Sequence, residues 1–319
     1  MDLELIINQN IVKQDYQNII DNWLLESEIS DNSKFTYELG LKRYISYLTE
    51  HNNMSSRTSI IEFKNELITK FSNSTAYIYI SGIKSFYRYL ARQYNITNIA
   101  SDVKLPKISR GFKKDCLTVE QVRKLLDSLE DGILVKARDK AMINLFIRCG
   151  LRCCELINAN IEDISTKDGL KVLYIKGKGH NEKDEFVVLT NDMLEILDKY
   201  LAMRKDYIDK SPLFASVSNR SYGKRLDSST IRSICKDYLR KIGIDTQRIS
   251  VHSFRHTAIT LSILAGSNLI DVKDFARHTD INTSLRYIHN LKRLENAPEL
   301  KIDEFLKENT NIKKDEIFS

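Results

Sequence analysis

The chain has 319 residues, 42% of them hydrophobic and 29% charged, which is enough for two domains and excludes wholesale disorder. Its net charge of +6 permits a polyanionic partner such as nucleic acid without requiring one. The sequence has no signal peptide and no run of about 20 apolar residues, so we expect a soluble, cytoplasmic protein without membrane contact.

The first hundred residues are dominated by amphipathic patterns with a helical period. Four helices are predicted, at residues 12–26, 33–49, 57–71 and 74–92, and the segment contains no clear strand. These patterns predict an all-α domain over residues 1–100.

A basic segment over residues 101–116 follows, with Pro106 and Gly111 opposing regular structure. Such a run is usually a solvated connector, but between two domains it can also lie along a phosphate backbone. The candidate DNA contacts are Lys104, Lys107, Arg110, Lys113 and Lys114 of this linker, together with Lys84 and Arg88 of the preceding helix.

The remainder, residues 117–319, mixes helices with one β signal. Thr118 and Gln121 form the capping box of a new helix. Two short apolar strands are predicted at 171–176 and 185–189, joined by a polar turn. Further helices are expected at about 135–148, 191–204, 229–241, over most of 252–289, and at about 298–308.

Three of the five cysteines crowd into "CGLRCC" as Cys149, Cys153 and Cys154. This spacing suits neither a disulfide framework nor a paired zinc knuckle. Buried free thiols are the favoured interpretation, and a thiolate metal site is the weaker alternative.

Histidine and arginine share the start of a helix in "VHSFRHT". His252 and His256 have the i, i+4 spacing of a zinc-protease helix, but Ser253 stands where that motif has its glutamate. Both histidines could instead be ordinary surface or capping residues. His252 and Arg255, three positions apart, would together suit a phosphate.

Two other cations have both a structural and a functional interpretation. Arg152 follows Gly150 at a helix junction and could simply pair with Glu155, the interpretation that this segment alone favours. Lys178 lies between two glycines in "KGKG" and could be a solvated turn residue. It could also be the ammonium of a mobile loop that acts as a general acid.

Taken together, these groups fit one reaction. Two guanidiniums, an ammonium, two imidazoles and a phenol, without a carboxylate cluster, would suit phosphoryl transfer with no metal ion or other cofactor. The phenol would be the covalent nucleophile. The candidate catalytic residues are Arg152, Lys178, His252, Arg255, His278 and Tyr287, with Glu155 in support.

The motifs "GLRCCEL", "KGKG", "VHSFRHT" and "ARHTDINTSLRYIH", in this order, resemble the tyrosine recombinase (phage integrase) family. The segments "SKFTYELGLKRYISYL" and "ISGIKSFYRYL" resemble the helices of its N-terminal SAM-like domain. The resemblance implies a mainly α fold with a small antiparallel β-sheet, arranged as a two-domain C-shaped clamp on duplex DNA. A core-binding domain at 1–100 and the linker at 101–116 would precede a catalytic domain at 117–319.

The resemblance also implies roles for the candidate residues. Arg152 and Arg255 would bind the scissile phosphate with help from His252 and His278, and Lys178 would protonate the leaving 5′ oxygen. Tyr287 would form a 3′-phosphotyrosyl bond, so that neither ATP nor metal is needed.

The implied partners are double-stranded DNA with inverted-repeat sites and a homotetramer that passes through a Holliday junction. The absence of an arm-binding module favours an Xer-like or Cre-like enzyme. The helix at 298–308 would dock on a neighbouring subunit or fold back on its own domain.

One departure concerns Arg277, which stands where many relatives have glycine before the second histidine and which would add a phosphate contact or alter helix packing. Two other functions stay open at this point. A type IB topoisomerase uses the same tyrosine chemistry to relax DNA, and a non-catalytic DNA-binding regulator would retain the fold.

Overall fold

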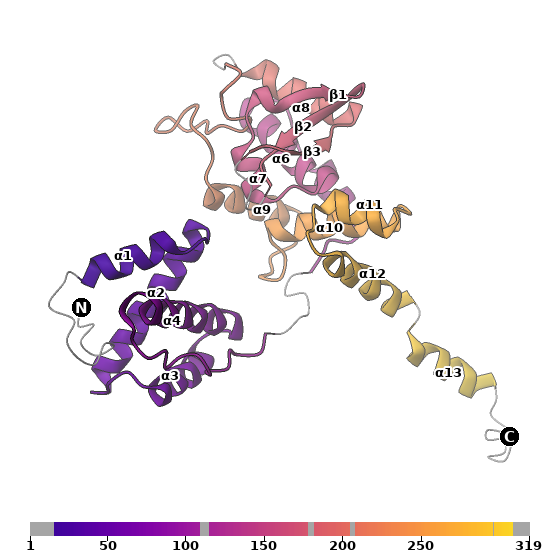
Figure 1. Ribbon diagram of the computed structural model, residues 1–319. Coiled ribbons are helices and arrows are strands. Elements are labelled where there is room, and N and C mark those ends of the chain that lie inside the picture. Colours follow the sequence, from indigo (N-terminus) through magenta and orange to yellow (C-terminus); the bar gives the residue numbers. More distant parts are fainter. Residues whose placement is uncertain (1–15, 109–114, 178–181, 205–207, 296, 309–319) are drawn as a thin grey trace. The chain divides into compact units, whose positions relative to one another are not determined.

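The computed structural model describes residues 16–108, 115–177, 182–204, 208–295 and 297–308 (Figure 1). The chain divides into two compact units, Met1–Gly111 and Phe112–Ser319. No helix in the described ranges combines the length and apolar character required to cross a membrane.

In the described part of the first unit there are four helices, α1 (Tyr16–Glu26), α2 (Asp31–Glu50), α3 (Arg57–Lys70) and α4 (Asn73–Tyr94). Serine side chains cap α2, α3 and α4, each accepting a hydrogen bond from a backbone N–H in the first turn. The core is aromatic, with Trp23, Tyr44, Phe86 and Tyr87 fully buried. The predicted helices of this region are therefore present, and residues 12–15 of the first lie outside the described residues.

Two glycines bring α2 and α4 into close contact. A Cβ atom on Gly40 would lie 2.9 Å from the Cα of Tyr79, and one on Gly82 would lie 2.9 Å from the Cα of Tyr37. Real Cβ atoms do not approach backbone this closely, so each helix needs a glycine where the other crosses it.

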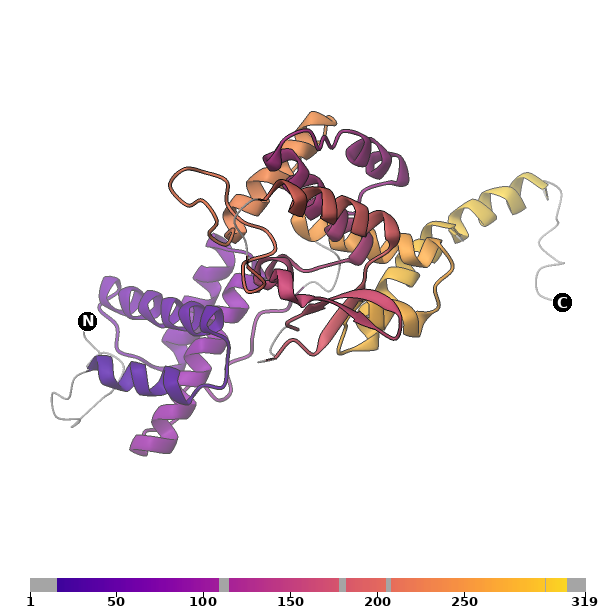
Figure 2. The same cartoon turned by 90° about the horizontal axis from the view of Figure 1, so that it is seen from above.

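The second unit begins with α5 (Val119–Asp127), capped by the predicted box of Thr118 and Gln121. Its core surrounds α6 (Leu134–Cys149), which is buried along most of its length and packs against α8 (Asn191–Met203) and α10 (Val251–Leu264). The short α7 (Cys153–Asn158) contacts α9 (Ser228–Lys241). Figure 2 shows the helices of this unit packed together, with the strands of its sheet along one side of them.

The sheet has three antiparallel strands in the order β1 (Ile164–Lys167), β2 (Leu170–Ile175) and β3 (Glu185–Val188). Val172 of β2 pairs with Val188 of β3, and Leu173 pairs with Val187. Both predicted strands are present, but β1 was not predicted. Its sequence "ISTK" contains one apolar residue, because it is an edge strand with two exposed positions.

The region predicted as helical over most of 252–289 consists of three helices. After α10 come α11 (Leu269–Ala276) and α12 (Ile281–Glu295). Gly266 and Arg277 have positive φ angles of 92° and 49° and separate them. The predicted tail helix is α13 (Pro298–Glu308), whose apolar residues Leu300, Ile302, Phe305 and Leu306 are all exposed. The predicted fold class, mainly helical with a small antiparallel sheet, is confirmed.

The five cysteines are free thiols. Cys149 and Cys235 are buried, but Cys154 and Cys116 are exposed, so the expectation of burial for "CGLRCC" is only partly correct. Cys154 lies on the solvent side of the one-and-a-half-turn helix α7. Within the described ranges, no group of His, Cys, Asp and Glu is arranged to hold a metal ion.

Candidate active site

The junction between α6 and α7 fixes the first arginine of the site. Gly150 ends α6 with a φ of 58°, in the left-handed region that glycine adopts without strain. Arg152 then caps α7, and its side chain is 22% exposed. Its Nη1 donates to Oε1 of Glu155 at 2.5 Å, and its backbone N–H donates to Oε2 at 2.7 Å. The ion pair that the segment predicted is therefore present.

Glu155 is the charge centre of the site. Its fully buried carboxylate lies 2.5 Å from Arg152, 2.8 Å from Arg277 and 3.9 Å from Arg255. Burial alone would raise the pKa of this carboxyl, but the charge of Arg277 and the hydrogen bond and charge of Arg152 outweigh it and lower the pKa. Glu155 is therefore ionised and holds three guanidiniums in one place.

Arg277 has a structural place beside this carboxylate. Its side chain is 3% exposed, and its Nη2 donates to Glu155 and to the Gly150 carbonyl at 2.9 Å. Its φ of 49° lies in the left-handed region, which glycine adopts without strain and other residues adopt rarely. Of the two predicted effects of this arginine, altered packing is the one that these contacts support.

The helix α10 carries the second arginine that was predicted to bind phosphate. Arg255 is buried and donates to the carbonyl of Gly150 at 2.6 Å and to the carbonyl of Ala276. Burial and the charges of Arg152 and Arg277 lower its pKa to about 9. His252, three residues earlier on the same helix, is exposed. The two residues therefore differ in burial, although their spacing of three predicts that they share a face of the helix.

Tyr287 lies where α10, α11 and α12 meet. Its ring is 6% exposed and packs in a small apolar cluster with Ile259, Val272 and Ala276. Its hydroxyl is hydrogen-bonded to Nδ1 of His256, and its ring stacks against His278 at a centroid distance of 6.2 Å.

Burial and charge oppose each other at this phenol. Burial raises the pKa of Tyr287 to about 12, although the nearby charges of Arg255 and Arg286 act to lower it. The phenol is therefore protonated at neutral pH and has to lose its proton before it can attack a phosphorus atom.

Both histidines beside Tyr287 are kept neutral. Burial lowers the pKa of His256 to about 4, with the charges of His252, Arg255 and Arg286 acting in the same direction. Burial, Arg255 and Arg152 also lower the pKa of His278 to about 4. Nδ1 of His278 is hydrogen-bonded at 2.8 Å to Oγ of the buried Ser284, which fixes the ring orientation.

The structure thus brings together Arg152, Glu155, Arg255, His278 and Tyr287 of the predicted set. His252 contributes its charge next to His256 from the exposed side of α10. Lys178 lies outside the described residues.

The sequence did not point to His256 or Ser284. The sequence pattern offers His256 only as a metal ligand or as a surface or capping residue. The one signal for a place in the site is its position four residues after His252, about one helical turn further along α10.

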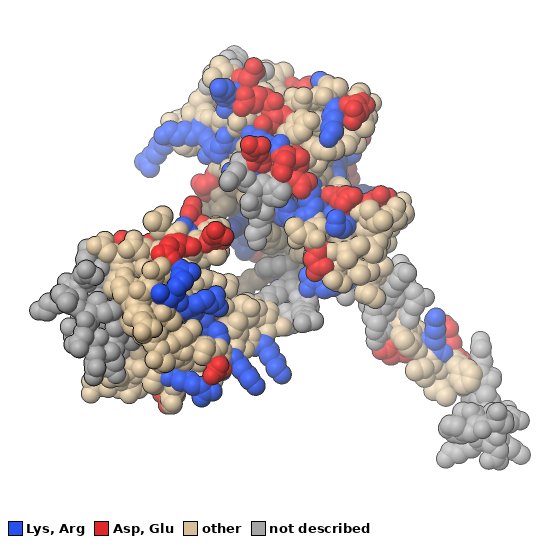
Figure 3. Space-filling view, viewed as in Figure 1, with Lys and Arg blue, Asp and Glu red and all other residues tan. Residues whose placement is uncertain are grey.

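The predicted DNA contacts have varied environments. Lys84 donates to the carbonyls of Ser101 and Val103, each at 2.7 Å, and so ties the end of the first unit to α4. Arg88, Lys104 and Lys107 are exposed, whereas Arg110, Lys113 and Lys114 lie outside the described residues. Figure 3 shows basic and acidic side chains interspersed on the visible face of the second unit, so charge alone marks no DNA surface there.

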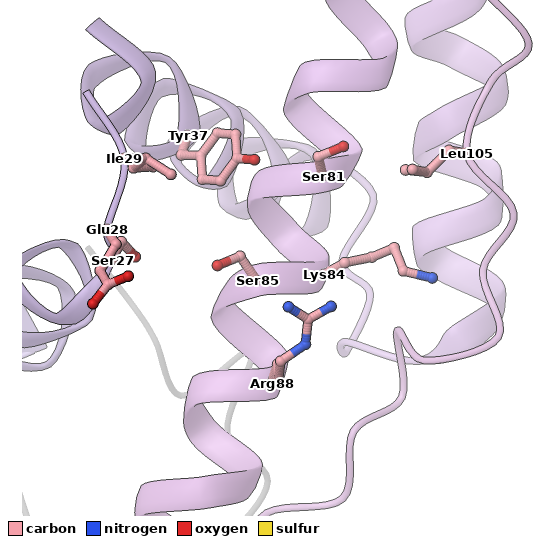
Figure 4. Close-up of a pocket in the computed structure, with 9 residues that line it drawn as sticks. All are labelled: Ser27, Glu28, Ile29, Tyr37, Ser81, Lys84, Ser85, Arg88 and Leu105. Atoms are coloured by element: carbon pink, nitrogen blue, oxygen red, sulfur yellow. The ribbon is translucent and has the colours of Figure 1, made fainter. Parts of the chain in front are cut away.

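A cavity of about 410 Å³ lies in the first unit, between α4 and the connection from α1 to α2. Arg88 lines it beside Ser85, while the Lys84 ammonium points toward the segment that carries Leu105 (Figure 4). Arg88 is therefore an exposed cation that lines this cavity.

Comparison with protein families gives two matches. The profile described as "Phage integrase family" matches residues 115–293, and "Phage integrase, N-terminal SAM-like domain" matches residues 20–94. The chain is 30% identical to the tyrosine recombinase XerC of Thermodesulfovibrio yellowstonii over 287 residues, which cover 87% of this chain and 92% of that protein. It is also 30% identical over 277 residues to the tyrosine recombinase XerD of Oceanobacillus iheyensis, covering 84% and 91%.

Solved structures share the fold. The XerH site-specific recombinase bound to its palindromic difH substrate, in a post-cleavage complex, aligns with a TM-score of 0.71 at 23% identity over 92% of each chain. A lambda integrase(75-356) dimer bound to a COC' core site aligns with a TM-score of 0.64 at 17% identity, covering 84% of this chain and 96% of that one.

Proposed function

The chain belongs to the phage integrase family of tyrosine recombinases and is a site-specific DNA recombinase, and we propose that Tyr287 is its nucleophile. The observation that carries this assignment is that the buried Glu155 carboxylate holds Arg152 and Arg255, while His278 and Tyr287 stack on each other close to Arg255. These groups come from α7, α10, α12 and the α11–α12 connection, and together they suit one scissile phosphate.

The two arginines bind the phosphate. Among the described residues, Arg152 and Arg255 each use two N–H groups in hydrogen bonds to protein, which leaves N–H groups of each guanidinium for non-bridging oxygens. Glu155 and the Gly150 carbonyl hold them before DNA arrives, so little reorganisation is needed as charge develops in the transition state. The arginines thus take the part that Mg²⁺ has in other phosphoryl transfers.

The reaction exchanges one phosphodiester for another. Oη of Tyr287 forms a bond to phosphorus, the bond from phosphorus to the 5′ oxygen breaks, and the leaving oxygen takes a proton. Lys178 supplies this proton, as the "KGKG" motif implies, and His278 donates a hydrogen bond to a phosphate oxygen. The 3′-phosphotyrosyl bond keeps the bond energy, so a 5′ hydroxyl from a second strand reverses the attack without ATP or metal.

The same family membership suggests the assembly. We propose that both units bind duplex DNA in the cytoplasm and that the exposed Lys104 and Lys107 of the linker contact its phosphate backbone. Four copies act on paired inverted-repeat sites and pass through a Holliday junction. The exposed Leu300, Ile302, Phe305 and Leu306 of α13 support docking of this helix on a neighbouring subunit.

The test is to express the protein and its Tyr287→Phe variant in cells that carry the native locus, capture protein-linked DNA after denaturation, and sequence the attachment points. We expect adducts from the wild type alone, clustered at one inverted repeat. Adducts that persist in the variant would refute the assignment of Tyr287.

A second arm uses supercoiled plasmids that carry two copies of the recovered site. Recombination gives products of exchanged length together with branched junctions. Relaxed circles without either would mean DNA relaxation of the topoisomerase type, and sequence-specific binding without any cleavage would indicate a regulator.

A further inference from the structure

The hydroxyl of Tyr287 has an imidazole as its partner. Nδ1 of His256, on α10, is hydrogen-bonded to Oη of Tyr287, on α12, and the ring centroids are 5.5 Å apart. His252, the α10 histidine that the family motif points to, is exposed, whereas His256 is partly buried beside the phenol. The atom that has to lose a proton is therefore in contact with His256.

We infer that His256 is the general base that accepts the Tyr287 proton during cleavage and returns it during rejoining. This inference rests on Tyr287 being the nucleophile. In the productive tautomer the imidazole carries its own proton on Nε2, so that Nδ1 accepts a hydrogen bond from the phenol.

The electrostatics of the pair fit this role. The Tyr287 pKa of about 12 means that bulk water at neutral pH provides very little phenolate. The His256 pKa of about 4 means that the imidazole is unprotonated and able to accept. The groups around it are His252 and Arg255 on α10, Arg286 on α12, and His278. A bound phosphate would place negative charge beside these neighbouring cations and offset their effect. The pKa of His256 would then rise toward the value that proton transfer requires.

The step balances without another reactant. As Oη bonds to phosphorus, its proton moves to Nδ1 and leaves an imidazolium beside the phosphotyrosyl group. When a 5′ hydroxyl attacks that group, the phenol leaves and takes the proton back from Nδ1. The proton required by the 5′ oxygen during cleavage comes from a separate acid.

The first experiment measures single-turnover cleavage of a nicked substrate by the full-length His256→Asn variant. The Asn amide occupies the place of Nδ1 and keeps a hydrogen bond to the phenol, but it cannot accept a proton. We expect a loss of about 100-fold or more, the range for general-base catalysis. His289→Asn, an exposed histidine two residues after Tyr287 on the same helix, is the matched control and should stay within about twofold.

Two readouts separate a base from a residue that only positions the tyrosine. The rate of His256→Asn should rise in proportion to hydroxide, whereas the wild-type rate levels off. Replacing Tyr287 by 3,5-difluorotyrosine, which has a more acidic phenol, should restore much of the rate in His256→Asn and little in the wild type. Protonation changes of His278 or Arg255 would affect both proteins alike.

Three results would overturn the inference: a His256→Asn rate within about threefold of the control, a slow variant that difluorotyrosine does not rescue, or rescue seen in His252→Asn instead. Failure of the proposed function gives a different result. The Tyr287→Phe variant lacks the proposed nucleophile, so DNA cleavage by this variant would refute the proposed function and not only the role of His256. Circular dichroism and DNA binding of each variant establish that the protein is folded.

Discussion

Glu155 offers the sharpest test of how the site is held together. In Glu155→Gln the carboxylate charge disappears while the side chain keeps its shape. Arg277, 3% exposed and 2.8 Å from this carboxylate, would remain as a buried cation without its counterion. Arg152 and Arg255 would lose the same partner.

The magnitude follows from the burial of both groups. An ion pair with charges about 4 Å apart is worth about 4 kcal/mol at an effective dielectric constant of about 20. Breaking a buried pair from one side typically costs about 3–5 kcal/mol. The Gln amide oxygen recovers about 1 kcal/mol by accepting one hydrogen bond. We therefore expect Glu155→Gln to lower the free energy of unfolding of the second unit by about 3 kcal/mol.

The assay uses urea unfolding with two probes. The single tryptophan, Trp23, is buried in the first unit, so its fluorescence reports that unit, whereas far-ultraviolet circular dichroism reports both. The transition of the second unit should move to lower urea in circular dichroism while the tryptophan transition stays in place.

Arg277→Gly is the second substitution of a double-mutant cycle with Glu155→Gln. Glycine suits the positive φ at this position, and its introduction removes the cation that Glu155→Gln would leave unpaired. The double variant should be more stable than the sum of the two single changes predicts, by about 1–2 kcal/mol. A cost of Glu155→Gln below about 1 kcal/mol, or strict additivity, would refute the view that Glu155 holds the arginines by charge.

Two further predictions concern stability. Gly82→Ala should destabilise the first unit by about 1–3 kcal/mol, since the new methyl would lie 2.9 Å from the Cα of Tyr37. The control is Gly132→Ala, whose methyl would have nothing within 4 Å and should change stability by less than about 0.5 kcal/mol. Tryptophan fluorescence during urea unfolding measures the former, and equal effects of the two would contradict the packing argument. His256 and His278 should make the second unit less stable as pH falls from about 6.5 to about 4, because their folded pKa values are lowered and the unfolded chain binds protons first. Since both rings are partly exposed, we expect about 1–2 kcal/mol for each, and a urea midpoint unchanged across this range would count against it.

Much of the fold could be predicted because local signals were strong. The capping box of Thr118 and Gln121 and the apolar period of α4 depend only on nearby residues. The strand β1 could not be predicted, because its four residues "ISTK" include a single apolar side chain and give no alternating pattern. The break at Arg277 was also hidden, since a non-glycine residue at positive φ gives no sequence signal.

The site was predictable as a set of residue types but not as a set of contacts. Arg152 and Glu155 are three residues apart, so their pairing could be foreseen. The contact of His256 with Tyr287 joins residues 31 positions apart and depends on how α10 and α12 cross. Arg277 shows the same limit, because its burial against Glu155 spans 122 positions.

The measurement that tests the central claim most directly is to locate the covalent bond to DNA. The wild-type protein would be trapped on a nicked suicide substrate, digested with trypsin and nuclease, and analysed by mass spectrometry. Cleavage after Arg286 and Lys292 releases residues 287–292, "YIHNLK", which contain one tyrosine. The account predicts a nucleotide attached to this peptide through Tyr287 and no adduct from Tyr287→Phe. A nucleotide attached to any other peptide would contradict it.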